Sequence, residues 1–199
     1  MTHSERAYYA QRAPEYDDFY LGTGLYASRA RPGWHEEVES LRSLLASLSF
    51  SAIADVACGT GFLTRHLAGR VVGIDQSLAM LQIARAWVPG GRVVQGDALG
   101  LPFPAGTFDC LSAGHYYGHL RQSDRDRFLV EAHRVAARIL IIDAAARGES
   151  STEEVQPRML NDGSRHSVYK RYFTPVQLLS ELGGGRVLHA GRWFVVVLA

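Results

Sequence analysis

The chain has 199 residues, 47% of them hydrophobic and 21% charged, which suits one domain of ordinary size with a full core rather than a disordered protein. Its formal net charge is +1, with acidic and basic residues interspersed, so nucleic acid is not an expected partner. No charged leader followed by an apolar stretch begins the chain, and no apolar run is long enough to cross a bilayer. We therefore expect a cytoplasmic protein without a membrane partner, either a monomer or a homodimer.

Strand and helix patterns alternate along the first three quarters of the chain. Apolar residues recur at helical spacing over 34–48, and the apolar, β-branched run 51–57 that follows is typical of a buried parallel strand. The same reasoning predicts, in order, helix 62–68, strand 70–74, helix 77–87 capped by Ser77, strand 92–95, strand 107–112, a helix from about 123 to 137, and strand 139–143.

The last quarter of the chain changes pattern. Thr174 and Gln177 form a capping box with Pro175 at the first helical position, and Gly183 ends that helix. Strands 186–190 and 193–198, separated by a short turn, predict an antiparallel hairpin. The fold class is therefore α/β, with a single Rossmann-like, doubly wound sheet that is mostly parallel. Ligands of such sheets bind at the carboxyl ends of the strands.

The first strand ends in the sequence Asp-Val-Ala-Cys-Gly-Thr-Gly, residues 55–61. Glycines at this turn permit positive φ and let a ligand approach the backbone closely. Unpaired amides at the start of the next helix suit a carboxylate or a phosphate. Taken alone, the turn fits a structural role equally well.

Acidic residues stand at the ends of the next two strands. Asp75 can accept hydrogen bonds from both hydroxyls of a ribose, and Asp97 can accept one from the exocyclic amine of adenine, although a Gly-Asp pair is also a common turn former. The nicotinamide fingerprint fits poorly, because Thr64 and Arg65 stand where it requires a small residue and Asp55 lies inside the first strand.

The segments D-V-A-C-G-T-G, V-G-I-D and Q-G-D-A resemble those of class I S-adenosylmethionine-dependent methyltransferases, in a small bacterial O-methyltransferase-like branch. The resemblance extends over the chain and implies one seven-stranded methyltransferase domain over 1–199, with 1–30 as an N-terminal lid or cap. It implies S-adenosylmethionine as cofactor and S-adenosylhomocysteine as product. Ala57 replaces the family's first glycine; because we expect it on the strand, alanine should cost little there.

The resemblance also implies roles for matching residues. The glycine turn would hold the methionine portion of the cofactor, Asp75 the ribose, and Asp97 with Ala98 the adenine. Tyr16 would close over the sulfonium, unless Tyr8, Tyr9 and Tyr16 merely pack the N-terminal helix. The expected cofactor-binding residues are Tyr16, Asp55, Ala57, Gly59, Gly61, Asp75, Gln76, Met80, Asp97, Ala98 and Gly114.

His115 and His119 follow the fourth strand of the sheet, where families of this class place residues facing the methyl group. His115 is the best candidate for a general base, and Tyr16 is the other expected catalytic residue; the pattern nevertheless favours a structural role for both histidines, hydrogen-bonded near the crevice, over a catalytic one. Spaced four apart, they could bind a metal, but no glutamate accompanies them and the glycines disfavour a helix, so we expect no metal. The Asp/Asn-Pro-Pro-aromatic motif of enzymes that methylate base or amide nitrogens is absent here.

Residues 158–171 are rich in positive charge, with four Arg or Lys residues and one Asp. A surface hairpin turning at 161–163 would carry these charges without consequence. The alternative is an anion clamp in which Arg158 and Lys170, the only lysine of the chain, grip the acceptor, with Tyr8 and His119 as further contacts. The segment resembles that of small bacterial O-methyltransferases, some of which act on phosphonate or carboxylate oxygens.

These patterns predict methylation of a small-molecule metabolite, on an oxygen of an anionic acceptor. Such an acceptor needs positioning more than it needs a base. Two alternatives stay open: a methyltransferase of a phenolic or amine metabolite that uses His115 as base, and a protein that binds S-adenosylmethionine without catalysis.

Overall fold

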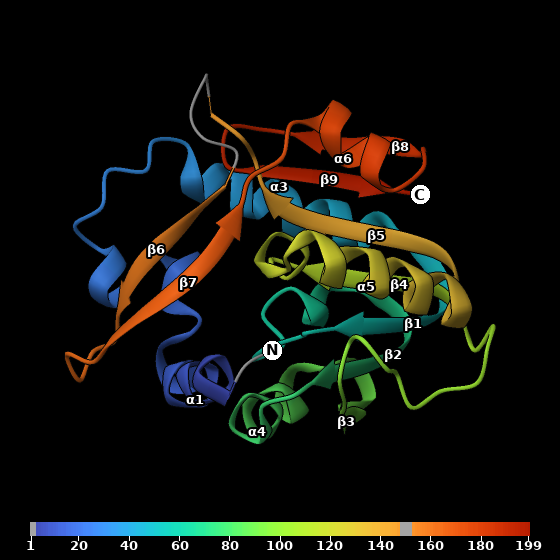
Figure 1. Cartoon of the computed structure of the whole chain (residues 1–199), viewed down its shortest axis with the longest axis horizontal. Coiled ribbons are helices and arrows are strands. Elements are labelled where there is room, and N and C mark those ends of the chain that lie inside the picture. The colour runs from blue at the N-terminus through green and yellow to red at the C-terminus, as the bar shows by residue number, and fades with distance from the viewer. Residues whose placement is uncertain (1–2, 148–152) are drawn as a thin grey trace.

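A seven-stranded mixed sheet forms the centre of the computed structural model, which describes residues 3–147 and 153–199 (Figure 1). The strand order is β3-β2-β1-β4-β5-β9-β8. Neighbours from β3 to β5 pair in parallel, whereas β9 is antiparallel to both β5 and β8. The strands are β1 (Ser49–Val56), β2 (Ala68–Asp75), β3 (Val93–Gln95), β4 (Phe108–Gly114), β5 (Ala136–Ala144), β8 (Arg186–Ala190) and β9 (Phe194–Leu198). The predicted parallel sheet with a C-terminal antiparallel hairpin is confirmed.

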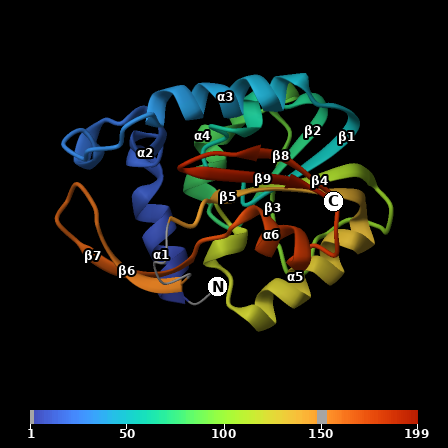
Figure 2. The same cartoon turned by 90° about the horizontal axis from the view of Figure 1, so that it is seen from above.

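Helices cover both faces of this sheet. On one face α3 (Trp34–Ser47) and α4 (Leu78–Trp87) share a buried cluster with Ile53 of β1. On the other, α5 (Gln122–Val135) and α6 (Pro175–Glu181) pack with the neighbouring Ala54. Figure 2 shows α3 and α5 on opposite sides of the strands. None of the described helices combines the length and the apolar character needed to cross a membrane.

Both predicted helix caps are present. The Ser77 hydroxyl accepts a hydrogen bond from the Met80 amide at 3.3 Å, which starts α4. Thr174 and Gln177 form the reciprocal capping box of α6. Because α4 begins directly after β2, its first turn lies at the carboxyl edge of the sheet.

The helix expected over 62–68 is wrong: only a short 3₁₀ turn, η3 (Thr64–His66), forms there. β1 is eight residues long, and its first residue, Ser49, pairs with Ala68 of β2. A strand rises about 3.3 Å per residue and an α-helix only about 1.5 Å. An α-helix over 62–68 would therefore be too short to return along β1. Residues 57–66 form turns and the 3₁₀ turn instead, and Leu67 already has β geometry.

The expectation that Ala57 lies on the first strand is also wrong. β1 ends at Val56, and Ala57 has a φ of 54°, in the left-handed region, where a Cβ crowds the carbonyl oxygen. The chain has to turn at this residue because the Cys58 amide donates to the Ile74 carbonyl of β2 at 3.0 Å. Alanine thus occupies a position whose geometry favours glycine.

Two segments outside the sheet lie side by side near its carboxyl edge (Figures 1 and 2). One is N-terminal and comprises α1 (His3–Arg12), η1 (Ala13–Glu15), α2 (Asp18–Leu21) and η2 (Gly24–Tyr26). The other is a two-stranded hairpin of β6 (Glu153–Met159) and β7 (Arg165–Arg171). The Tyr8 ring packs against the tilted His166 ring with 4.9 Å between ring centroids, and Glu15 accepts a hydrogen bond from the Asn161 amide at 2.8 Å.

Candidate functional site

A cavity of about 50 Å³ lies beside the turn that follows β1, and we call it the loop cavity. It is bordered by the carboxyl ends of β2 and β4 and by the first turn of α4, because residues from these elements line it. Its lining residues are Tyr9, Tyr16, Ala57, Gly59, Asp75, Gln76, Ser77, Met80, Gly96, Ala98, Gly114, His115 and Tyr116. All of the expected cofactor-binding residues except Asp55, Gly61 and Asp97 are among them.

Asp75 is held in one orientation by the backbone around it. One carboxylate oxygen accepts a hydrogen bond from the Gly59 amide at 3.0 Å, and the other accepts one from the Ser77 amide at 2.8 Å. Burial raises the pKa of this carboxyl group, and the backbone amides partly offset that effect. The turn after β1 and the start of α4 therefore fix a carboxylate at the wall of the loop cavity.

Gln76, next to Asp75, gives the loop cavity an unsatisfied acceptor. Its side-chain Oε1 is buried and has no hydrogen-bond partner, a state that leaves the cost of desolvation uncompensated. The Gln76 Oε1, the Asp75 carboxylate and the buried Met80 side chain together suit a ligand that has hydroxyl or amine donors and an apolar face. The residues present fit a nucleoside.

Three residues that were expected to bind the cofactor lie outside the loop cavity. Asp55 is 4% exposed and accepts a hydrogen bond from the Thr64 hydroxyl; burial raises its pKa to about 6. Gly61 faces α4, where an added Cβ would lie 3.5 Å from the Ala84 Cα. Asp97 accepts from the Leu99 amide of its own turn at 3.0 Å. These contacts place Asp55 and Gly61 beneath the turn and Asp97 at the margin of the cavity.

The N-terminal segment closes over the glycine turn. An added Cβ on Gly59 would lie 3.2 Å from the Tyr16 ring, so the ring covers that glycine. The neighbouring Asp17 accepts a hydrogen bond from the Thr60 hydroxyl and pairs with Arg65 at 3.2 Å. The segment is therefore bonded to the same turn that borders the loop cavity.

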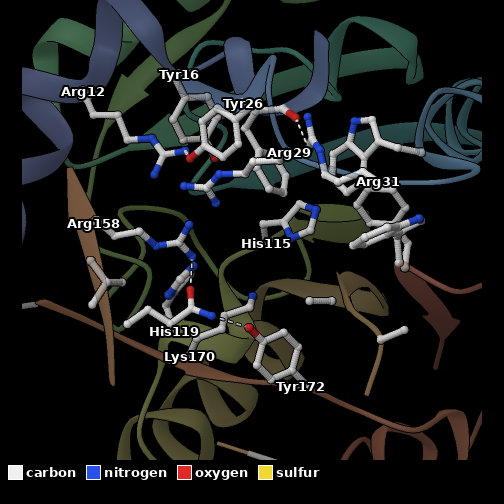
Figure 3. A pocket seen from close by; sticks show the side chains of 18 of the residues that line it. Arg12, Tyr16, Tyr26, Arg29, Arg31, His115, His119, Arg158, Lys170 and Tyr172 are labelled. Carbon is white, nitrogen blue, oxygen red and sulfur yellow. Dashed lines mark hydrogen bonds between the residues drawn. The ribbon is translucent and has the colours of Figure 1, made fainter. Parts of the chain in front are cut away.

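A second, larger cavity of about 190 Å³ opens beside the first, and we call it the arginine cavity (Figure 3). Its lining residues are Tyr8, Tyr9, Arg12, Tyr16, Phe19, Tyr26, Arg29, Arg31, Trp34, His115, His119, Ala144, Ala145, Arg147, Gln156, Arg158, Val168, Lys170, Tyr172, Trp193 and Phe194. Tyr9, Tyr16 and His115 line both cavities, so the two meet at these side chains.

Two arginines face the part of the arginine cavity nearest the loop cavity. Arg12 donates to the Tyr8 hydroxyl and, at 3.0 Å, to the Tyr26 hydroxyl, and its guanidinium lies 5.2 Å from the centroid of the Tyr16 ring. Arg158 donates to the Gln156 side chain, and its Nε is buried without a partner. Among the described residues neither arginine forms an ion pair, so both retain charge for a ligand.

Lys170, expected to grip the acceptor, also lines the arginine cavity, but its charge is balanced. Its ammonium group donates to Asp143; the two residues are 4% and 0% exposed. Asp143 also accepts a hydrogen bond from the Gly118 amide at 2.7 Å. Lys170 and Asp143 therefore form a buried ion pair that joins β7 to β5.

His115 forms part of the wall between the two cavities in a strained conformation, with φ of 52°. Its Nε2 is buried and has no hydrogen-bond partner. Burial, followed by the charge of Lys170, lowers the pKa of His115 to about 3. His119 lies within η5 (Tyr117–His119), its Nδ1 is 2.7 Å from the Tyr169 carbonyl oxygen, and burial lowers its pKa well below the usual value. Both imidazoles are neutral at pH 7.

Sequence reasoning assigned no binding role to several residues that line the cavities, above all Arg12, Arg29 and Arg31. The available signal was the concentration of Tyr and Arg in the first 31 residues, which is unusual for a helix that only packs. Within 3–147 and 153–199, no group of three or more His, Cys, Asp or Glu residues is arranged so that it could hold a metal ion.

Comparison with known proteins agrees with this geometry. Residues 53–138 match the family described as "Methyltransferase domain". A 2-phytyl-1,4-naphtoquinone methyltransferase of Thermosynechococcus vestitus is 39% identical over 114 residues, covering 51% of this chain and 50% of that protein. A dTDP-3-amino-3,6-dideoxy-alpha-D-glucopyranose N,N-dimethyltransferase of Streptomyces fradiae is 35% identical over 142 residues, covering 67% and 51%. The chain spans about half the length of the curated relatives it matches.

One solved structure is similar over its whole length. The complex titled DhpI-SAM-HEP has a TM-score of 0.74 and 22% identity, with 100% of this chain and 98% of that chain covered. At this identity the similarity shows the fold. It extends to the N-terminal segment and the β6–β7 hairpin, which the matched family domain does not include.

Proposed function

Since this chain belongs to the class I S-adenosylmethionine-dependent methyltransferases, we propose that it methylates an oxygen of a small anionic acceptor bound in the arginine cavity. One observation carries the proposal. The arginine cavity is lined by arginines, and none of its described lining residues carries a carboxylate. This positively charged cavity meets the loop cavity at Tyr9, Tyr16 and His115.

The loop cavity is the site for the cofactor. Asp75 and Gln76 present hydrogen-bond acceptors to a nucleoside, and Tyr16 shields the glycine turn from solvent. When bound, S-adenosylmethionine supplies an activated methyl carbon, whose bond to sulfur breaks as its bond to the acceptor oxygen forms, the electron pair of the broken bond staying on sulfur. The protein's task is to align the acceptor oxygen with that carbon and to exclude water.

Arg12 and Arg158 bind the acceptor and hold its anionic group beside Tyr16. An acceptor that is already ionised needs no general base. His115, with a pKa near 3, is a very weak base and acts by positioning, as a neutral hydrogen-bond partner whose Nε2 lacks one in the free protein. Because Asp143 balances the charge of Lys170, we assign binding of the anionic group to the arginines and not to Lys170.

A phenolic or amine acceptor is the second candidate. Aromatic rings surround His115, with centroids of Phe19, Tyr20 and Phe194 between 5.2 and 5.7 Å from the imidazole, and they would pack against a flat acceptor. Removing a proton from a phenol or an ammonium group requires a stronger base than an imidazole of pKa near 3. The low basicity of His115 therefore favours the anionic acceptor.

Cofactor binding is tested by calorimetry with S-adenosylmethionine and S-adenosylhomocysteine. A charge-assisted hydrogen bond contributes about 1.5–3 kcal/mol, so Asp75→Ala should raise Kd about tenfold to a hundredfold or more. Gly59→Val should abolish binding, because its side chain would meet the Tyr16 ring. Asp124→Ala, on α5, is the control and should bind normally. Unchanged affinity of a folded Asp75→Ala variant would remove Asp75 from the site.

The acceptor class is tested by transfer of tritiated methyl groups to a panel of carboxylates, phosphonates, phenols and amines. We expect acids to be methylated, and Arg158→Met to lower kcat/KM about a hundredfold while cofactor affinity stays unchanged. Arg165→Met is the matched control, because Arg165 belongs to the same hairpin but is exposed and lines neither cavity. Preference for a phenol by a fully active Arg158→Met variant would refute the proposal; transfer to no acceptor would indicate a non-catalytic binder.

A further inference from the structure

Arg29 and Arg31 add positive charge to the arginine cavity beyond what one acid group requires. Both line the cavity, and among the described residues neither pairs with a carboxylate. The Arg31 guanidinium lies 3.9 Å from the centroid of the Trp34 ring and donates to the Phe19 carbonyl at 2.7 Å. The Arg29 guanidinium lies 4.6 Å from the centroid of the Tyr26 ring. Arg31 is thus fixed by its neighbours, while Arg29 is exposed.

Tyr26 contacts these two arginines and Arg12 through different parts of its side chain. Its hydroxyl accepts the hydrogen bond from Arg12, whereas its ring faces Arg29 and, at 5.4 Å, Arg31 (Figure 3). Burial lowers the pKa of His115, with further contributions from the charges of Lys170, Arg158 and Arg12, and burial lowers the pKa of Arg31, with a further contribution from the charge of Arg29. We call Arg12 and Arg158 the inner pair and Arg29 and Arg31 the outer pair.

The charge balance of the cavity points to a ligand with more than one acid group. Five guanidinium groups line the cavity, the fifth being that of Arg147, which lies 4.3 Å from the centroid of the Trp193 ring, and none of the described lining residues carries a carboxylate. These like charges repel one another, and they do so more strongly at a partly buried site than in water. A carboxylate neutralises one of them and a phosphonate dianion at most two. A planar guanidinium also matches the two oxygens of an acid group by paired hydrogen bonds, so the outer pair is suited to bind a second group of this kind.

We propose that the acceptor is a bifunctional acid: the inner pair holds the acid group that is methylated, and the outer pair binds a second carboxylate, phosphonate or phosphate group at the other end of the same molecule. This inference rests on the proposed function, because it assigns the substrate class of the same site. Specificity for the length of the acceptor then comes from the distance between the two pairs.

Matched pairs of acids test this directly. Propylphosphonate and 3-phosphonopropionate, and linear monocarboxylates and dicarboxylates of two to six carbons, differ only in the second acid group. We expect the best diacid to exceed its monoacid partner in kcat/KM by about tenfold or more, the effect of a charge-assisted hydrogen bond. Arg29→Met should reduce this ratio toward one. Arg158→Met should instead lower both members of the pair.

Control and alternative variants keep the test decisive. Arg42→Met, on the exposed part of α3, should preserve the ratio. Because Arg31 packs on Trp34 and its loss could unfold this segment, Arg31→Lys is used there; it keeps a charge but lacks the planar fork, so the ratio should fall. A ratio near one for every spacer, or an unchanged diacid preference in Arg29→Met, would overturn the proposal.

Binding without turnover separates this proposal from the proposed function. Calorimetry of the diacid and its monoacid partner, on the protein without cofactor, should show tighter binding of the diacid and loss of that difference in Arg29→Met. Equal affinity for the two would overturn the second acid site. Failure of every acid to accept a methyl group would refute the proposed function, whereas the difference in affinity tests the outer pair by itself.

Discussion

Ala57 and His115 are the residues other than glycine that have a left-handed backbone in the described chain, with φ of 54° and 52°. Both line the loop cavity, and His115 also lines the arginine cavity. Such a conformation costs roughly 1–3 kcal/mol and persists only where the surrounding structure imposes it. The turn after β1 thus holds strain at the loop cavity, and the residue after β4 holds strain where the two cavities meet.

Replacing Ala57 by glycine should stabilise the protein. The left-handed conformation costs alanine roughly 1–2 kcal/mol, and the greater freedom of glycine in the unfolded chain offsets about 0.4–1 kcal/mol of that gain. We expect Ala57→Gly to raise the free energy of unfolding by about 0.5–1 kcal/mol, measured by denaturant titration. Ala54→Gly, the same change three residues earlier on β1, should lower it. Destabilisation by both variants would show that Ala57 is not strained.

His115 should make stability depend on pH in the acid range. Its pKa is about 3 in the folded protein and about 6.5 in the unfolded chain, so below pH 6.5 only the unfolded state gains the proton. The unfolding free energy should therefore fall as pH decreases from 6.5 toward 3, by up to about 1.4 kcal/mol per pH unit. His115→Asn, which tolerates positive φ, should show a shallower decline in urea titrations at pH 4–7. Parallel curves for the two proteins would refute a neutral His115.

Asp17 is the residue through which the N-terminal segment acts on the glycine turn. It bonds Thr60 and Arg65, which follow β1, so Asp17→Asn should loosen the segment and expose the loop cavity. We expect Kd for S-adenosylhomocysteine to rise about tenfold by calorimetry, the effect of one charge-assisted bond. Asp18→Asn removes the same charge from the next residue, which bonds Thr23 instead, and should stay within about twofold. If both variants raised Kd equally, the loss of a negative charge would explain the change, and the bonds of Asp17 to Thr60 and Arg65 would not.

At the level of elements, the sheet could be predicted and the second cavity could not. Periodicity and caps such as Ser77 and Thr174 are local signals, and both caps are present. The wrong helix at 62–68 had an apolar pattern, but the distance back along β1 decided its conformation. Arg29 and Arg31 reach the cavity through tertiary contacts with Tyr26 and Trp34, which no local pattern encodes.

The same limit explains why the sequence suggested that Lys170 binds the acceptor. Its position in a basic hairpin suggested a free charge for the acceptor, yet Asp143, 27 positions earlier in the chain, neutralises it. Asp143 was visible only as the end of a strand. The isolated bridge between Ala145 and Phe173, just beyond β5 and β7, brings the two together. Only the assembled fold shows that Arg158, among the described residues, lines the cavity without an ion pair.

The whole molecule consists of the sheet domain and two covering segments that meet over the cavities (Figure 1). The N-terminal segment contacts the hairpin through Tyr8, which packs with Leu160 and Val168. The hairpin in turn is joined to the sheet by the ion pair of Lys170 with Asp143 and by the bond between His119 and the Tyr169 carbonyl. Loss of the contacts between the hairpin and the sheet should therefore lower the stability of the whole chain.

A double-mutant cycle tests how strongly the charges of Lys170 and Asp143 stabilise each other. Asp143→Asn leaves a buried ammonium group without its counter-charge, and Lys170→Met leaves a buried carboxylate held only by the amides of Gly118 and Ala144. Breaking a buried pair on one side costs about 3–5 kcal/mol, so each single variant should lower the unfolding free energy by about that amount in urea titrations.

The double variant Asp143→Asn with Lys170→Met should be less unstable than the sum of the single variants by about 1–3 kcal/mol, because neither buried charge is then left alone. The exposed pair of Arg127 and Asp124 on α5 provides the control, since its cycle should give less than about 0.5 kcal/mol. Additive effects at Lys170 and Asp143 would mean that the two charges are solvated separately. The hairpin would then be attached to the sheet by its apolar contacts and backbone hydrogen bonds, with no contribution from the ion pair.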